Sequence, residues 1–129
     1  MRLSAKIIKN YFGNNTFDYG NEWIVRANEP NTLYFQIVDL DQDGLRYMSG
    51  ATVLSVSAIF PSIDSADVIN APAVQAHAND KSIYKIQLGA SQIPKSGNVV
   101  FQISEDGIIR KFSILNGIQV EFPGSDGSC

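Results

Sequence analysis

The chain has one cysteine, one histidine and few charged residues, and each scarcity excludes a class of protein. A single cysteine permits no intrachain disulfide, so we expect synthesis in a reducing cytosol or a fold that does not depend on oxidation. Zinc sites need three or four Cys, His or carboxylate ligands, so no zinc centre is expected. A net charge of −3 and a pI near 4.9 argue against nucleic-acid binding, which requires a basic surface.

Long apolar runs are also missing from the 129 residues. No stretch reaches the roughly 18 apolar residues of a membrane span, and the amino-terminal segment lacks the apolar core of a secretory signal. What is present is a 44% share of hydrophobic residues, which suffices for the core of one domain. We therefore expect a single domain over residues 1–123 and a flexible tail over residues 124–129, which ends in Cys129.

Hydrophobic residues alternate with other residues along most of the chain, which is the period of a β-strand. Helical stripes are absent, and the alanine-rich segment 62–79 contains Pro72 and allows only a single turn near Ser62–Ala66. The predicted strands are Leu3–Tyr11, Trp23–Ala27, Thr32–Leu40, Arg46–Met48, Ala51–Phe60, Val74–Ala78, Ser82–Leu88, Asn98–Ser104, Ile108–Leu115 and Ile118–Phe122.

Turn signals separate these segments. Asp43-Gly44, Asp106-Gly107 and Asn116-Gly117 each favour the positive backbone φ of a tight hairpin, so the last three strands are predicted to form a meander. Phe12–Gly20 is rich in asparagine and glycine and is predicted to be a loop between sheets. Eight to ten short strands with close turns predict an all-β, immunoglobulin-like antiparallel β-sandwich, with a small closed β-barrel as the alternative.

The series Asp39-x-Asp41-x-Asp43-Gly44 matches the first half of a calcium-binding loop, where alternate carboxylates converge on the ion. The second half does not match, because the twelfth position holds Gly50 where such a loop needs a glutamate. A hairpin turn with solvent-facing carboxylates explains the same residues and is preferred over a weak calcium site.

No set of residues predicts catalysis. His77 is the only histidine, and no Gly-x-Ser-x-Gly nucleophile motif accompanies it, so a structural or surface role is favoured over a catalytic one. Glu105 and Asp106 are adjacent in a predicted turn and are interpreted as solubilising residues rather than as a glycosidase pair. No cofactor is expected, because phosphate-binding glycine loops are missing.

Aromatic residues gather before residue 24, and Tyr47 follows later. Such residues fill a sandwich core, form a protein interface or line a sugar platform, and all three readings stay open. The interface candidates are Tyr11, Phe12, Phe17, Tyr19, Trp23 and Tyr47.

Two segments resemble a known family. Residues 27–53 contain the strand Leu33-Tyr34-Phe35-Gln36-Ile37-Val38-Asp39, an Asp43-Gly44 turn and Gly50-Ala51-Thr52-Val53, and residues 82–103 end in Gly97-Asn98-Val99-Val100-Phe101. Together they resemble small immunoglobulin-like domains of tailed-bacteriophage virion proteins, such as the amino-terminal domain of baseplate upper proteins.

The resemblance implies a non-enzymatic structural protein of a phage virion, made in the bacterial cytoplasm, that forms homo-oligomers. A capsid decoration (cement) protein or a tail or neck component fits best, with capsid or tail subunits as partners and with neither nucleic acid nor membrane. Met1–Tyr11 and the carboxyl-terminal tail are predicted to act as arms that add a strand to a neighbour's sheet edge. The alternative is a carbohydrate-binding or adhesin module with a glycan ligand.

Overall fold

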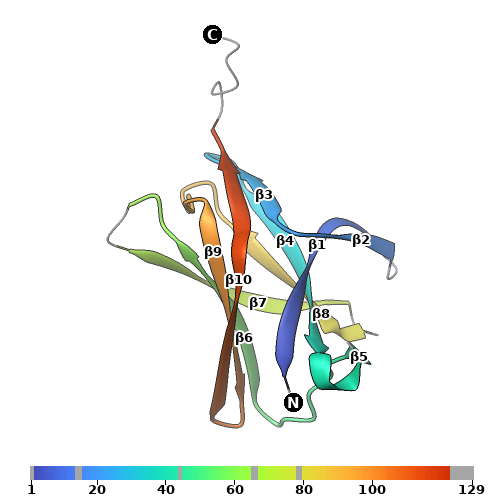
Figure 1. Ribbon diagram of the computed structural model, residues 1–129. Coiled ribbons are helices and arrows are strands. Elements are labelled where there is room, and N and C mark those ends of the chain that lie inside the picture. The colour runs from blue at the N-terminus through green and yellow to red at the C-terminus, as the bar shows by residue number, and fades with distance from the viewer. Residues whose placement is uncertain (1, 14–15, 44, 65–66, 78–79, 123–129) are drawn as a thin grey trace.

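The computed structural model describes residues 2–13, 16–43, 45–64, 67–77 and 80–122 (Figure 1). It contains ten strands and one short 3-10 helix. In chain order these are β1 (Leu3–Gly13), β2 (Thr16–Gly20), β3 (Trp23–Arg26), β4 (Asn31–Asp39), η1 (Leu40–Gln42), β5 (Leu45–Arg46), β6 (Leu54–Pro61), β7 (Val68–His77), β8 (Asp80–Leu88), β9 (Gly97–Glu105) and β10 (Ile108–Glu121).

The strands form one hydrogen-bonded path, in the order β2-β1-β4-β8-β7-β6-β9-β10-β3, and β5 adds to β4. The first half of β7 pairs with β6 and its second half pairs with β8, so this strand passes from one layer to the other. We call the layer from β2 to β8 sheet A and the layer from β6 to β3 sheet B. The path ends at β2 and β3 and does not close, which excludes the barrel alternative and confirms the prediction of an all-β, sandwich-like fold.

The core lies between the two sheets. Inward-facing side chains alternate with outward-facing ones along β6 and β9, and Val56, Ala58 and Phe60 of β6 are buried in the same core cluster as Phe35 of β4. Trp23 lies at the centre, with its ring centroid 5.8–6.0 Å from those of Phe35, Phe60 and Phe101. The two-residue alternation in the sequence therefore corresponds to burial, as expected for strands.

The Asp106-Gly107 hairpin is confirmed, since both residues have positive φ (47° and 90°) and β9 pairs with β10 on either side of them. The Asn116-Gly117 hairpin is wrong. Asn116 does have a positive φ of 54°, but it lies in a bulge within β10, which continues to Glu121 and there pairs in parallel with β3. The meander of three final strands is therefore a single hairpin with a long second strand.

Two further predictions about strands are corrected. The segment predicted as the loop Phe12–Gly20 contains β2, which pairs with the second half of β1. The segment Met1–Tyr11, predicted to be a free arm, instead supplies β1, which pairs with β4 from Leu3 to Ile8 and with β2 from Ile7 onward. Gly44 and the predicted tail 124–129, including Cys129, lie outside the described residues, as does part of the predicted turn Ser62–Ala66.

β7 begins earlier than predicted because Pro72 is tolerated within it. Ser57 and Pro72 face each other in the β6–β7 ladder, and β8 pairs with β7 only from Val74 onward. Pro72 thus lies where β7 is an edge strand, and a residue without an N–H group removes no ladder hydrogen bond there.

Candidate docking surface

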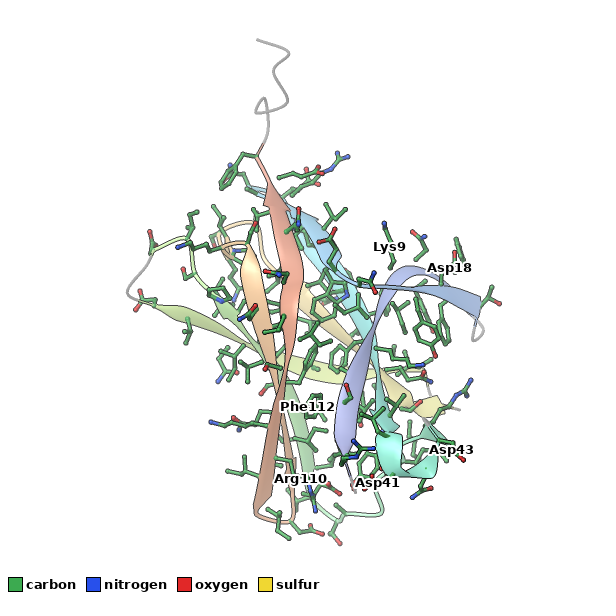
Figure 2. The ribbon with its side chains drawn as sticks, viewed as in Figure 1. Lys9, Asp18, Asp41, Asp43, Arg110 and Phe112 are labelled. Atoms are coloured by element: carbon green, nitrogen blue, oxygen red, sulfur yellow. The ribbon has the colours of Figure 1, made fainter. Side chains whose placement is uncertain are left out.

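The end of β1 and the whole of β2 form a projecting hairpin. β1 pairs with β4 only as far as Ile8, and a register shift between Ile8 and Asn10 then turns it away from that strand. We call residues 9–13 and 16–20 the hairpin arm, which extends beyond the body of the molecule in Figure 1. Lys9 and Asp18 point outward from this arm (Figure 2).

Four of the six interface candidates lie on the hairpin arm: Tyr11, Phe12, Phe17 and Tyr19. Phe12 is 66% exposed and Tyr19 is 49% exposed. The other two rings are half-buried, Tyr11 stacking on Tyr34 with centroids 4.3 Å apart and Phe17 meeting the edge of Tyr19 at 5.1 Å. The arm therefore presents aromatic surface outside the main core.

Polar contacts fix the base of this aromatic group. The Tyr19 hydroxyl donates a hydrogen bond to Gln36 Oε1, and Gln36 Nε2 donates to Ser82 Oγ at 3.1 Å. Lys6 Nζ lies 5.1 Å from the centroid of the Tyr19 ring, within the range of a cation–π contact. The ring of Tyr19 is thus held in one orientation although half of its surface is exposed.

A hollow of about 420 Å³ lies where the hairpin arm leaves β4. It is lined by residues 8–12, 22–24 and 32–34, which combine aromatic rings with the polar side chains of Lys9, Asn10, Glu22 and Thr32. The indole N–H of Trp23 donates to the Tyr34 carbonyl at 2.9 Å beside it. The size and mixed lining of this hollow fall within the range of small-ligand sites.

The remaining two interface candidates lie elsewhere. Trp23 is only 3% exposed and belongs to the core, which was one of the readings of the aromatic group. Tyr47 is half-buried, and its hydroxyl donates a hydrogen bond to Glu105 Oε2. Neither side chain joins the exposed surface of the hairpin arm.

The acidic series 39–43 forms a helix cap. Asp39 is 3% exposed, and its Oδ1 accepts hydrogen bonds from the backbone N–H groups of Asp41 (3.0 Å) and Arg2 (3.3 Å). Asp41 pairs with the Arg2 guanidinium at 2.7 Å, and Asp43 ends η1 with a φ of 55° (Figure 2). Within the described ranges, no group of three His, Cys, Asp or Glu side chains could hold a metal ion.

His77 is the last residue of β7, and its side chain lies outside the described ones. No helix in the described part of the chain has the length and apolar character of a membrane span.

Glu105 is the residue whose role the sequence interpretation missed. It was interpreted as solubilising, but its carboxylate accepts hydrogen bonds from Tyr47, from Ser49 Oγ at 2.8 Å and from Arg110 Nη1 at 2.7 Å. Asp106 likewise accepts from the backbone N–H groups of Thr52 and Val53. The two turn carboxylates therefore fasten the segment 47–53 to the β9–β10 hairpin.

Burial is the main cause of a raised pKa of the Tyr47 hydroxyl, and its hydrogen bond to Glu105 raises that pKa further. The raised pKa keeps the Tyr47 hydroxyl protonated, and a protonated hydroxyl can donate its hydrogen bond to the Glu105 carboxylate. No sequence signal marks this contact, because Tyr47 and Glu105 are separated by 58 positions.

Comparison with known proteins finds no match for this sequence, either among protein-family models or among curated proteins.

Proposed function

We propose that this protein is a non-enzymatic structural component of a tailed-bacteriophage virion, and that it acts by docking on other virion subunits and by oligomerising. A capsid decoration protein or a tail or neck component is the form we favour. The hairpin arm carries the proposal, because it gathers aromatic side chains on a projecting element outside the core, as protein interfaces do. The resemblance of residues 27–53 and 82–103 to virion domains supplies the virion context.

Cosedimentation with purified capsids and tails of the phage that encodes the chain tests this proposal. We expect the wild-type protein to sediment with one of these particles and Phe12→Glu to lose most of that binding. Val68→Glu is the matched control, because Val68 is also 66% exposed but lies on β7, away from the hairpin arm. A protein that stays monomeric and binds neither particle refutes the proposal.

A second candidate is a carbohydrate-binding or adhesin module, and the hollow beside the hairpin arm favours it. Tyr11 and Tyr34 are stacked with an interplanar angle of 17°, and polar side chains that could bond sugar hydroxyls line the same hollow. A glycan array tests this candidate, with Tyr34→Ala as the variant that should lose binding. An array without a specific hit removes it.

A further inference from the structure

We propose that this protein accepts an extended segment of another protein as an added strand between β1 and β10. We call this place the seam: it is bordered by residues 3–6 of β1 and by residues 109–115 of β10. The inference goes beyond the proposed function, because it concerns the mode of recognition and holds for a partner inside or outside a virion. It also reverses the expectation from the sequence, since the chain receives a strand here instead of donating one.

Among the described strands, none pairs with the seam-facing edge of β10 along its first half. β9 pairs with the opposite edge from Ile108 to Ile114, and β3 pairs with the seam-facing edge only from Ile118 onward. In a hairpin with a two-residue turn the flanking pair is hydrogen-bonded, so the backbone groups of Ile108 and Arg110 point to β9. Those of Ile109, Lys111 and Ser113 consequently point into the seam.

β1 presents a matching edge. The Leu40 N–H donates to the Arg2 carbonyl at 2.8 Å, and this bonded pair sets the alternation along the β1–β4 ladder. Leu3 and Ala5 therefore direct their N–H and C=O groups away from β4. β2 does not reach them, because its pairing with β1 begins at Ile7.

A hollow opens at one end of this seam, but some Cα atoms of β1 and β10 lie within 8 Å of each other. Two strands that flank a third lie about 9.6 Å apart, so the seam must widen to hold an added strand. The hollow has a volume of about 350 Å³ and is lined by Ala5, Lys6 and Ile7 of β1, by residues 19–21 and by Ile114 of β10. Unpaired strand edges template the addition of further chain, and this hollow gives such a chain access to the edges.

The hydrophobic core is incompletely covered along the same line. Leu3, Phe112 and Ile114 face inward and pack against the core, yet each remains half-buried. The inward-facing residues of the neighbouring strand β9, Val99, Phe101 and Ile103, are 0% exposed. Figure 2 shows Phe112 between β10 and β1. An added strand would cover these three side chains as β10 covers those of β9.

These features define the chemistry of the partner. A strand of about five to seven residues matches a typical pairing length. Every second side chain should be apolar, to cover Phe112 and Ile114. The side chains between should be acidic, because the exposed lysines Lys6 and Lys111 flank the solvent side of the seam. The partner is therefore an extended, alternating apolar and acidic segment.

Amide hydrogen exchange of the full chain tests the inference. It is measured with and without a synthetic nonapeptide in which valine and glutamate alternate. In the free protein, we expect rapid exchange at the seam-facing amides and slow exchange at their strand neighbours. The seam-facing set is Leu3, Ala5, Lys111 and Ser113, and the neighbouring set is Ser4, Lys6, Arg110 and Phe112. The nonapeptide should slow the first set at least tenfold, and a version with a central proline should not.

Ser113→Pro removes one seam-facing N–H group without removing a hydrogen bond to β9, and Ser113→Ala keeps that group. We expect the nonapeptide to bind Ser113→Pro at least tenfold more weakly than Ser113→Ala, with both variants folded by circular dichroism. Ala5→Pro on β1 is the second variant if Ser113→Pro does not fold. Three results would each overturn the inference. They are slow exchange of the seam-facing amides in the free monomer, equal binding of the nonapeptide to the proline and alanine variants, and protection that arises only from dimerisation.

Discussion

Replacing Glu105 by alanine should destabilise the protein more than the loss of any other carboxylate in a turn. The carboxylate accepts three hydrogen bonds, from Tyr47, Ser49 and Arg110, and its side chain is only 13% exposed. The Arg110 side chain is 34% exposed, so water weakens this ion pair and replaces part of the interaction after the mutation.

The expected cost follows from these contacts. A neutral hydrogen bond contributes about 1 kcal/mol, and a donor left without a partner adds to the loss when it is half-buried. The Tyr47 and Ser49 contacts then account for about 2 kcal/mol and the screened Arg110 contact for up to about 1 kcal/mol. We therefore expect about 2–3 kcal/mol, which lowers Tm by roughly 8–12 °C for a chain of this length.

Urea unfolding and thermal melts of Glu105→Ala measure this loss, and Glu29→Gln serves as an exposed control that should change stability by less than about 0.5 kcal/mol. A double-mutant cycle with Tyr47→Phe should show coupling above about 0.5 kcal/mol. A Glu105→Ala variant within about 0.5 kcal/mol of wild type, or fully additive mutations, would show that this network does not hold the segment 47–53 in place.

Three further predictions follow from other contacts. Because the folded pKa of Tyr47 is raised above its unfolded value of 10.0, its contribution to stability is complete below pH 10 and falls as the pH rises above it. Burial also raises the pKa of Tyr84, so Tyr47→Phe should show a smaller fall than wild type in pH-dependent urea unfolding, and an identical fall in both proteins would contradict the assignment. Asp39→Ala should lower the free energy of unfolding by about 1–2 kcal/mol, because the cap of η1 is lost. Millimolar calcium should leave the wild-type Tm unchanged, because the Asp39 and Asp41 oxygens already accept hydrogen bonds. A rise in Tm with calcium would instead support a calcium site. Asn116→Val should lower the free energy of unfolding by about 1–2 kcal/mol because Asn116 has a positive φ, whereas Asn116→Gly should be nearly neutral. Equal Tm values for the two variants would show that the bulge relaxes to accept valine.

The alternation of side chains predicted most strands because burial on one face of a strand has a period of two residues. This period says which residues face the core and does not say which strands pair. The parallel pairing of β3 with the end of β10 therefore had no signal in the sequence. Asn116-Gly117 was misread for a related reason: a positive φ serves a tight turn and a bulge equally well, and only the length of the strand beyond distinguishes them.

The candidate docking surface was predictable in its residues and not in its shape. The aromatic character of Tyr11, Phe12, Phe17 and Tyr19 marked them as candidates. β2 escaped prediction because its short alternation of Phe17 and Tyr19 lies in a segment rich in asparagine and glycine, which is typical of a loop. Glu105 was misread because a carboxylate next to Asp106-Gly107 usually faces solvent. Its partners Tyr47 and Ser49 reach it only through the fold, more than 50 positions along the chain.

The placement of the first and last strands has a mechanical consequence. β1 starts at one end of the molecule and β10 finishes at the other, and the two run in the same general direction (Figure 1). A load applied between Leu3 and Glu121 therefore acts along the strand axes, parallel to the β1–β4 and β9–β10 ladders. The hydrogen bonds of each ladder share this shear and must fail together, whereas a load across the strands would break them one at a time. Such a chain can transmit tension along its length while both sheets stay folded.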